Sequence, residues 1–568
     1  MIDRRAPDSE KIMRSAADHE RITTGHWFFL SLLTPIALTL SFPPFYLWPL
    51  ALIALAPLSN CVLQRPVRLR YLIWYYLLGL AYFTGNLYWL VGVTWAGYLA
   101  SCVYLAVYFP AYAILLRLLV LRIKLPATAT VPIVFTALEY LRCTLFTGFS
   151  WFPLGAALAP SNILLQSADL CGVYGLTFLA CIPAGFAADW LSSPPARRVR
   201  RLFLQGALAV AIIIAAVGYG VFRLMQQTLT AGPTVAVLQQ NIPESIKDTG
   251  DINEDKKLFA SYMALTQEAA KQHPDLIVWP ETMVPGYLNP EWLSFKPDLF
   301  SPGYFRDLLV ADQQFAAELA EFSYDSGASL LVGSGAIYYG SDAEPQKFQN
   351  VAVMFTPTLG ESPVIYAKRH LVPFGEYVPF KNWPALHHLL ISLTPIGFDY
   401  SATPGDQWTH FTLQKDTMTW QFGVPICYED AMPGPSREFV KPEMGKKGAD
   451  FLVSISNDGW YQSLAELQQH LQLDQVRAVE NRVPIARSVN GGDCGFVDSN
   501  GCVGKLVEVN GQSAFVTGVA VEQLMLDSRI SPYSRFGDVL PVVLLIFCGM
   551  SLIFIILFRR EQPKDKTI

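Results

Sequence analysis

The sequence has little charge for its length. Only 16% of its 568 residues are Asp, Glu, Lys or Arg, whereas 52% are hydrophobic, and the mean hydropathy is +0.30. Soluble domains carry about 25% charged residues. The shortage of charge therefore indicates a membrane protein, and the small net charge of −5 points to no particular partner.

Two further absences narrow the function. The nine cysteines lack the paired CxxC or Cys/His spacing of a structural zinc site, so neither a metal centre nor a disulfide framework is expected. No basic stripe with interleaved aromatic residues occurs, so no nucleic-acid partner is expected. Only three cysteines fall in the polar part of the chain, Cys427, Cys494 and Cys502.

Charged residues are also missing from two long runs, Trp27–Gln64 and Tyr71–Leu116. A helix crosses a bilayer in about 20 residues, so each run is too long for one span. Pro43-Pro44 divides the first run, and glycines near 92–97 divide the second. With four later apolar segments the chain is predicted to have eight spans, at 27–42, 46–63, two within 71–116, and near 128–148, 170–188, 202–222 and 539–558.

Lys and Arg gather at alternate ends of these segments, which is the positive-inside pattern of membrane proteins. A buried all-helical soluble core would not produce this alternation. The pattern predicts cytoplasmic tails at 1–26 and 559–568, a membrane domain of seven spans at 27–224, an extracytoplasmic domain at 225–537 and a last span at 538–558. The basic clusters are Arg65/Arg68/Arg70, Arg117/Arg122/Lys124, Arg197/Arg198/Arg200/Arg201 and Arg559/Arg560/Lys564/Lys566.

The segment 225–537 has a different pattern. Short apolar runs rich in β-branched and aromatic residues alternate with helical stretches such as 255–272 and 464–481. Near-continuous apolar strands between helices are typical of an α/β layer structure with both sheet faces covered. The expected strands are 234–238, 276–279, 330–332, 351–355, 420–426, 451–455, 484–489 and 514–519.

Three pieces of this segment carry reactive side chains. An apolar run ends in Trp279-Pro280-Glu281, and another ends in Cys427-Tyr428-Glu429. Between them, a loop stiffened by two prolines and a glycine presents Lys368 and Glu376 at its ends. Each piece alone is explained as well by a solvated strand end, a surface loop or a packed cysteine.

Together the three pieces resemble the Glu–Lys–Cys triad of the nitrilase superfamily, in the same chain order. The Trp-Pro-Glu, Lys-x-x-Leu-Val-Pro-Phe-Gly-Glu and Cys-Tyr-Glu blocks are similar, more specifically, to those of apolipoprotein N-acyltransferases. The resemblance covers roughly 27–560, because that family also has eight spans with a nitrilase-like αββα sandwich inserted before the last. It implies a polytopic membrane enzyme with an extracytoplasmic catalytic domain.

The resemblance assigns roles that thiol chemistry supports. A thiol has a pKa of about 8.5 and only its thiolate attacks, so Cys427 needs a base, Glu281, and a cation, Lys368. Lys368 would also stabilise the oxyanion of the intermediate. Glu376 is expected to hold Lys368 or Glu281, and Tyr428 and Glu429 to shape the pocket beside the nucleophile.

The implied reaction has two halves. Cys427 takes an acyl chain from a phospholipid, expected to be the sn-1 chain of phosphatidylethanolamine, and passes it to the N-terminal α-amine of a diacylglyceryl apolipoprotein. No cofactor or metal is implied, and a monomer in the bacterial inner membrane, with its catalytic domain in the periplasm, is expected. A membrane-anchored amidase and a non-catalytic transporter or scaffold are the alternatives.

Several features stay open. Cys494 and Cys502 sit in glycine-rich turns with no acid–lysine pair, which makes them weaker candidates than Cys427. The stretch after Ile242 lacks the tryptophan usual in the family, and Asn490-Gly491-Gly492 departs from its Asn-Thr-Gly turn. Aromatic residues at 286–304 indicate either a mobile apolar loop, which covers the acyl chain or dips into the bilayer, or an ordinary surface loop. The charged residues Glu139, Arg142 and Asp169 either meet a lipid headgroup or pair with each other.

Overall fold

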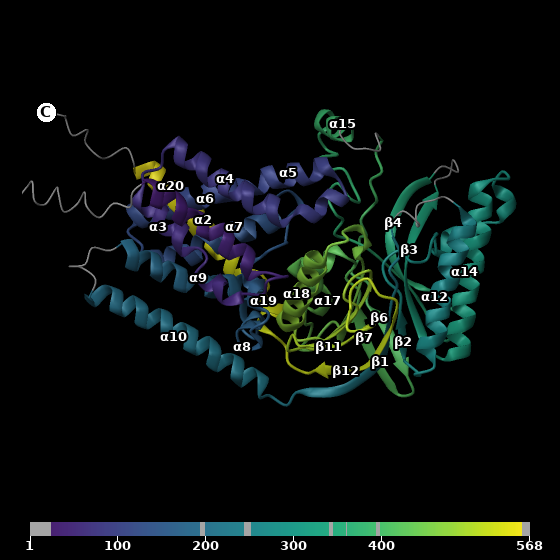
Figure 1. Ribbon diagram of the computed structural model, residues 1–568. Coiled ribbons are helices and arrows are strands. Elements are labelled where there is room, and N and C mark those ends of the chain that lie inside the picture. The colour runs from purple at the N-terminus through teal and green to yellow at the C-terminus, as the bar shows by residue number, and fades with distance from the viewer. Residues whose placement is uncertain are drawn as a thin grey trace, which may run out of the picture.

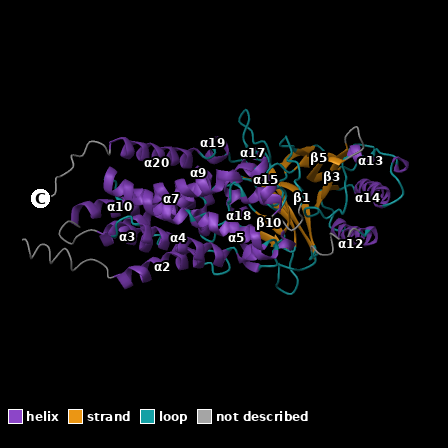
Figure 2. Cartoon of the chain, turned by 90° about the horizontal axis from the view of Figure 1, so that it is seen from above, coloured by secondary structure: helices purple, strands orange, loops and turns teal. Residues whose placement is uncertain are grey.

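The computed structural model describes residues 24–192, 199–243, 251–339, 345–358, 360–392 and 398–558. Most of the two predicted tails, the basic residues Arg197 and Arg198, and the stretch in which the family has its tryptophan lie outside these residues. A helical part and a part built on strands are arranged end to end (Figures 1 and 2).

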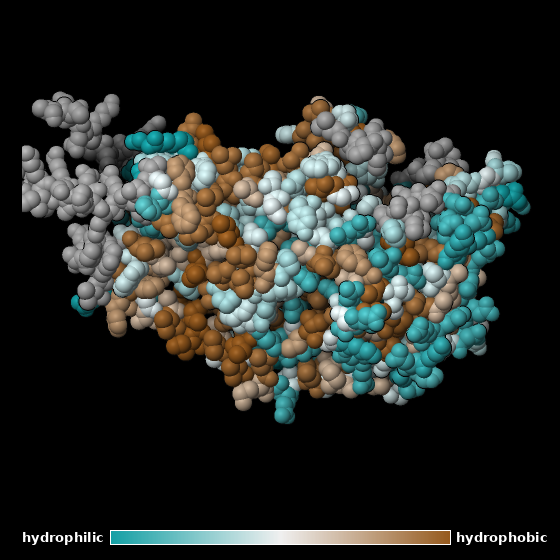
Figure 3. Space-filling view, viewed as in Figure 1, coloured by the Kyte–Doolittle hydropathy of each residue, from teal (hydrophilic) through white to brown (hydrophobic). Residues whose placement is uncertain are grey.

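Helices form the first part because its sequence is apolar without interruption by charge. Four of the described helical segments are long and apolar enough to cross a membrane: Trp95–Ile123, Ala168–Ser192, Leu202–Leu224 and Val539–Leu557. Apolar side chains cover this half of the visible face, and hydrophilic side chains cover the other half (Figure 3). The helices are α2 Thr24–Ser41, α3 Ala56–Gln64, α4 Leu69–Asn86, α5 Trp95–Ala106, α6 Tyr108–Leu118, α7 Ala127–Thr144, α8 Asn162–Leu165, α9 Ala168–Ser192, α10 Val199–Leu224 and α20 Val539–Phe558.

Short helical turns connect or extend these helices, and two more lie in the second part. In the first part they are η1 Trp48–Leu52, η2 Tyr88–Gly92, η3 Leu119–Ile123, η4 Leu145–Thr147 and η5 Leu154–Leu158, and in the second part η7 Pro297–Leu299 and η8 Asp458–Trp460.

The second part contains two six-stranded sheets, with strand orders β12-β1-β2-β3-β4-β5 and β11-β10-β9-β8-β7-β6. The three strands β1, β2 and β3 pair in parallel, and so do β7, β8 and β9. The first sheet comprises β1 Leu229–Gln239, β2 Leu276–Val278, β3 Ser329–Tyr339, β4 Pro345–Phe355, β5 Val364–Ala367 and β12 Gly518–Asp527. The second comprises β6 Phe411–Lys415, β7 Met418–Gly423, β8 Phe451–Asn457, β9 Ile485–Asn490, β10 Gly495–Val497 and β11 Val503–Leu506.

The sheets pack face to face and helices cover their outer faces. Alternate residues of β1 point to opposite sides: Val235 and Val237 join the core between the sheets, whereas Ala236 and Leu238 join the core under helices. The helices of this part are α12 Ile252–Ala270, α13 Pro290–Leu293, α14 Tyr304–Ser326, α15 Pro384–Ser392, α16 Tyr428–Ala431, α17 Pro433–Val440, α18 Leu464–Asn481 and α19 Pro532–Phe536. Of these, α12 and α14 pack on the first sheet and α17 and α18 on the second. The expected α/β sandwich is therefore present.

Helix α18 joins the two parts of the molecule. Its Ala478 packs in the core between the sheets, while Leu473, Val476 and Val479 belong to one core cluster with the membrane helices. Figure 1 shows α18 between the strands and α9. The second sheet is thus fastened to the helical part through α18, which contributes residues to both cores.

The eight expected strands overlap β1 to β4, β7 to β9 and β12, and the two expected helical stretches overlap α12 and α18. The strands β5, β6, β10 and β11 were not predicted. Helix α14 was not predicted, although Leu308, Phe315 and Leu319 on one face are buried in the structure. The strand expected at 514–519 is wrong in its first half, because the last strand, β12, begins only at Gly518.

Candidate active site

Glu281 follows β2, and its carboxylate is held on both oxygens. Oε1 accepts hydrogen bonds from Lys368 Nζ at 3.2 Å and from Asn350 Nδ2 at 2.7 Å. Oε2 accepts from the backbone N–H of Asn457 at 3.0 Å. The neighbouring strand β3 has a glycine here, and a Cβ at Gly333 would lie 2.6 Å from the Cα of Glu281. The close approach of the acid to β3 therefore requires Gly333.

Lys368 follows the edge strand β5 and is 1% exposed. Its Nζ forms ion pairs with Glu281 Oε1 at 3.2 Å and Glu376 Oε2 at 2.9 Å. Burial disfavours the charge, but the two carboxylates raise the pKa of the Lys368 ammonium well above its usual value. Lys368 is therefore a fixed cation beside Glu281.

Asn350, on β4, connects the two acids and was missed by the sequence analysis. Its Nδ2 donates to Glu281 Oε1 at 2.7 Å and to Glu376 Oε1 at 2.9 Å. The backbone of the same residue also accepts a hydrogen bond from the N–H of Lys368 at 2.8 Å. Asn350 thus fixes the positions of all three charged side chains, yet no local motif marks it in the sequence.

Cys427 precedes α16 in a left-handed backbone conformation, with φ of 52°. Its N–H donates to Ile455 O of β8 at 2.8 Å. The same strand ends at Asn457, whose N–H holds Glu281, so β8 brings the thiol and the acid to one place. Burial and the charge of Glu281 raise the pKa of the thiol well above its usual value, while Lys368 lowers it. Activation of the thiol therefore requires a base.

Glu429 is fully buried and ties the loop of the lysine to the loop of the thiol. Its carboxylate accepts from Tyr366 Oη at 2.9 Å and from the backbone N–H groups of Arg369 at 2.8 Å and Ile426 at 2.9 Å. Burial raises the pKa of Glu429 to about 7, and the backbone donors oppose this shift. Glu429 therefore holds these two loops together from a fully buried position.

Tyr428 faces the helical part of the molecule. Its hydroxyl donates to Gly148 O at 3.2 Å, and its ring stacks on Trp151 with centroids 6.2 Å apart. Both partners lie in the connection between α7 and α9. A membrane-domain loop therefore contacts the residue next to the thiol.

Arg142 and Glu139 organise that loop from α7. Arg142 donates to the carbonyls of Phe149, Trp151 and Phe152. Glu139 accepts from the N–H of Leu154 at 2.8 Å and lies 4.0 Å from Arg142.

Asp169, the third of these charged residues, is also paired. Asp169 forms ion pairs with Arg223 at 2.6 Å and Arg482 at 2.7 Å. The prediction that these three charges pair with each other therefore holds for Glu139 and Arg142 and is wrong for Asp169, whose partners are Arg223 and Arg482.

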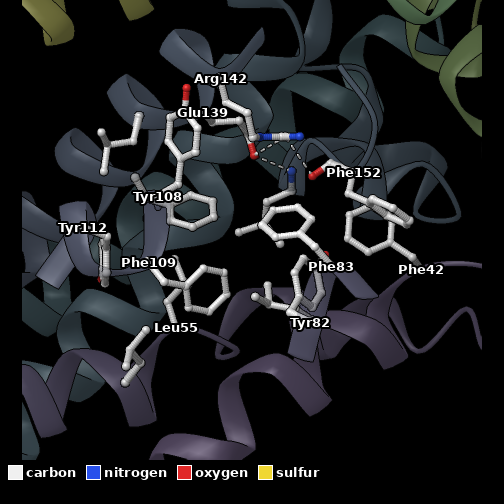
Figure 4. A pocket seen from close by; sticks show the side chains of 15 residues that line it. Phe42, Leu55, Tyr82, Phe83, Tyr108, Phe109, Tyr112, Glu139, Arg142 and Phe152 are labelled. Atoms are coloured by element: carbon white, nitrogen blue, oxygen red, sulfur yellow. Dashed lines mark hydrogen bonds and ion pairs between the residues drawn. The ribbon is translucent and has the colours of Figure 1, made fainter. Parts of the chain in front are cut away.

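An apolar cavity lies among the helices next to this pair. Figure 4 shows Glu139 and Arg142 at one end and Leu55 and Tyr112 at the other. Between them, aromatic rings from α4 and α6 line the space, including Tyr82, Phe83, Tyr108 and Phe109.

The prediction of a mobile apolar loop at 286–304 is wrong for its central residue. Trp292 is fully buried, its Nε1 donates to Asp312 Oδ2 at 2.8 Å, and its ring stacks on Tyr339 with centroids 5.6 Å apart. The aromatic residues of this segment form a small core of their own with Leu308 and Leu309.

The side chain of Asn490 connects two neighbouring segments by hydrogen bonds. The Asn490 side chain accepts from the N–H of Ile242 at 3.0 Å and donates to Asn457 Oδ1 at 2.8 Å. Asn490 therefore supports Asn457, whose backbone N–H donates to Glu281. The other polar-segment cysteines lie elsewhere: Cys494 is buried and donates to Arg487 O at 3.1 Å, and Cys502 is exposed beside Asn162.

Known proteins resemble both parts. Residues 35–186 match the model of the apolipoprotein N-acyltransferase N-terminal domain, and residues 234–518 match that of carbon-nitrogen hydrolases. The apolipoprotein N-acyltransferase of Geobacter metallireducens is 30% identical over 94% of this chain and 96% of its own. The chain belongs to the apolipoprotein N-acyltransferase family. The relative from Caulobacter vibrioides is 30% identical over 92% of this chain and 93% of its own.

Solved structures resemble the chain more distantly. An amidase of the nitrilase superfamily from Nesterenkonia AN1 is 15% identical, covering 53% of this chain and 93% of its own, with a TM-score of 0.34. The NitFhit protein of C. elegans is 16% identical, covering 60% and 67%, with a TM-score of 0.35.

Membership of the apolipoprotein N-acyltransferase family makes the chain an acyltransferase with a nitrilase-type α/β domain and apolar membrane helices. The predictions of family, enzyme class and general function are confirmed, as is the α/β domain. The roles of individual residues stay predictions, and so do the count of eight spans and the domain boundaries.

Proposed function

We propose that the chain carries an acyl group from a phospholipid to the N-terminal α-amine of a lipoprotein, through a thioester on Cys427. The observation that carries this proposal is the buried arrangement of Glu281, Lys368 and Cys427, held together through β8 beside a loop of the membrane helices. The names of the relatives support the choice of a lipoprotein as acceptor.

In the first half-reaction Glu281 takes the thiol proton and the thiolate attacks the ester carbonyl of the lipid. Lys368 stabilises the oxyanion of the tetrahedral intermediate, an effect worth several kcal/mol where water is excluded. Glu281 then returns the proton to the departing alkoxide, and a lysophospholipid leaves. The first-formed product on the enzyme is a thioester of Cys427.

In the second half-reaction the amine of the acceptor attacks the thioester. Glu281 takes a proton from the attacking nitrogen, and the C–S bond breaks to regenerate Cys427. The product is an amide. Glu376, through Lys368, and Glu429, through the loops of Lys368 and Cys427, position the reacting groups.

The apolar cavity beside Glu139 and Arg142 supports a lipid donor. A site for an acyl chain should be apolar along its length, and aromatic and aliphatic side chains line this cavity (Figure 4). We infer that the donor is the sn-1 chain of phosphatidylethanolamine and that the acceptor is a diacylglyceryl apolipoprotein.

The same proposal includes a topology. The chain would cross the bacterial inner membrane eight times, with the tails 1–26 and 559–568 in the cytoplasm. The segment 225–537 would then be a catalytic domain in the periplasm, and the protein would act as a monomer. The alternation of basic clusters along the sequence supports this orientation. Labelling of single introduced cysteines at 229 and at 66 in intact cells tests it, because only the first should react with an impermeant reagent.

Purified full-length protein with labelled phospholipid and a diacylglyceryl lipopeptide tests the function. We expect an N-acylated lipopeptide and a lysophospholipid in equal amounts, and neither with Cys427→Ala. Cleavage of short amides without lipopeptide acylation would instead identify an amidase. A transporter or scaffold would acylate no lipopeptide with or without Cys427, and acylation that is unchanged in Cys427→Ala would show that Cys427 is not the nucleophile.

A further inference from the structure

A second group of charged side chains lies behind Cys427, between β8, β9 and α18. It comprises Asp430, Asp458, Glu466, His470, Asp474 and Arg487, all of which are at most 1% exposed. Arg487 forms ion pairs with Asp430, Asp458 and Asp474. The group plays no part in the proposed reaction steps.

One member of the group has no partner among the described residues. Both carboxylate oxygens of Glu466 are buried and form no hydrogen bond there. A buried carboxylate without donors costs several kcal/mol, so a cation or a proton must compensate it. Burial and the charge of Asp458 raise the pKa of Glu466 well above its usual value, which reflects the same missing compensation.

The charges of the group do not balance. Four carboxylates, from Asp430, Asp458, Glu466 and Asp474, surround one guanidinium, that of Arg487, and one imidazole, that of His470. Even a protonated His470 leaves two negative charges in excess when all four carboxylates are ionised. Either several protons or one divalent cation must offset the excess.

Ligand atoms for such a cation already lie together. One nitrogen of His470 and one carboxylate oxygen each of Asp458 and Glu466 are within 4.8 Å of one another. Glu466 and His470 are four residues apart on α18, so they share one face of the helix. His470 Nδ1 lies 3.1 Å from Asp458 Oδ2, close to the separation of about 3.3 Å between ligand atoms of a tetrahedral zinc ion with bonds of about 2.0–2.1 Å.

The far side of the imidazole has a suitable partner. His470 Nε2 lies 2.6 Å from Asp430 Oδ1. When Nε2–H donates to that carboxylate, the lone pair of Nδ1 faces Asp458, as in the carboxylate–histidine–metal arrangement of metalloproteins.

We propose that Asp458, Glu466 and His470 bind a divalent transition-metal ion, zinc by the chemistry of one imidazole and two carboxylates. A turn of the Glu466 side chain toward Asp458 closes the site, and water supplies the fourth ligand. The ion links α18 to the end of β8 and, through Asp430, to the turn that follows Cys427. It is a structural ion and takes no part in the acyl transfer.

Metal binding by full-length protein in detergent tests this site. The protein is stripped with a chelator, titrated with Zn²⁺ against a chromophoric competitor, and its bound metal is measured by mass spectrometry. We expect about one equivalent per chain, and a loss of at least about 10-fold in affinity for Glu466→Gln. Glutamine has the same size as glutamate, and the carboxylate of Glu466 makes no hydrogen bond with the described residues. The Glu466→Gln variant should therefore fold.

Two matched variants and a spectrum complete the test. Glu268→Gln, on an exposed position of α12, and Cys502→Ala, which removes an exposed thiol, should bind as the unaltered protein does. Bound Co²⁺ should show the visible bands of tetrahedral oxygen and nitrogen coordination without the near-ultraviolet absorption of a thiolate. Absence of bound zinc, or equal affinity in Glu466→Gln, would overturn the proposal and leave protons as the compensating charges, whatever the outcome for acyl transfer.

Discussion

The two sheets of the α/β part are built alike but pack against different surroundings. The first sheet has α12 and α14 on its outer face, and these helices carry hydrophilic side chains toward solvent (Figures 1 and 3). The second sheet has α18 on its outer face, and α18 packs into the core of the membrane helices. One half of the sandwich therefore faces water, and the other is fastened to the membrane part.

The chemistry is divided in the same way. Glu281, Lys368 and Asn350 come from the water-facing half, and Cys427 comes from the half joined to the membrane helices. In the proposed reaction, the groups for proton transfer and charge stabilisation therefore come from the first sheet, and the thiol that carries the acyl group comes from the second. Variants on each half should therefore fail in different ways.

The largest effect is expected on the water-facing half. Glu281→Gln keeps a hydrogen-bonding side chain of the same size but removes the base, so lipopeptide acylation should fall by about 10²–10⁴-fold. Initial rates at saturating lipid measure this. Asn253→Gln, at an exposed position of α12, is the control and should keep the full rate.

The largest effect on stability is expected where the second half meets the membrane helices. Arg142→Gln leaves Glu139 buried without its cation and removes donors to three carbonyls, so the free energy of unfolding should fall by about 3–5 kcal/mol. Unfolding in detergent measures this. The double variant with Glu139→Gln should recover part of the loss, and a loss below 1 kcal/mol would contradict the assigned role.

The rate at which Cys427 is alkylated reports how the charges of the first sheet act on the thiol of the second. The pKa of the thiol is well above 9.0, so alkylation should accelerate with pH up to 9 without a plateau. Glu281→Gln removes a charge that raises the pKa of the thiol, so alkylation should accelerate. Lys368→Met removes a charge that lowers this pKa, so alkylation should slow. Peptide mass spectrometry measures modification of Cys427 alone.

Catalysis should fall in both variants, so Glu281→Gln is expected to be more reactive toward the alkylating agent and less active as an enzyme. Slower alkylation in that variant would contradict the assigned electrostatics.

The smallest effect on the acylation rate is expected where Tyr428 contacts the membrane-domain loop. Tyr428→Phe removes one hydrogen bond to Gly148 and keeps the stacking on Trp151, so the acylation rate should fall by about 5-fold, equivalent to about 1 kcal/mol. Tyr324→Phe, on the exposed side of α14, is the matched control. Equal rates for both variants would show that the hydroxyl contact is dispensable.

The sequence predicts the reactive residues better than it predicts their supports. Glu281, Lys368 and Cys427 each end an apolar run within a recognisable block, and the structure brings Glu281 and Lys368 within 3.2 Å. Asn350 and the N–H of Asn457 complete the site from strands distant in sequence, and no periodicity marks them. The acidic cluster around His470 is similarly assembled from three separate elements.

Burial explains the wrong predictions. Trp292 was expected in a mobile apolar loop because aromatic residues gather around it in the sequence, but long-range packing on Tyr339 buries it. The apolar face of α14, which was not predicted, is interrupted by the buried Asp312. In both cases tertiary contacts outweigh local composition.

The most direct test of the account is the intermediate itself. Full-length protein incubated with phospholipid carrying a labelled acyl chain, without acceptor, should gain one acyl group that hydroxylamine removes. The group should map to Cys427, be absent in Cys427→Ala and persist in Cys494→Ala and Cys502→Ala. Acylation of a different residue, or an adduct that survives in Cys427→Ala, would contradict the account.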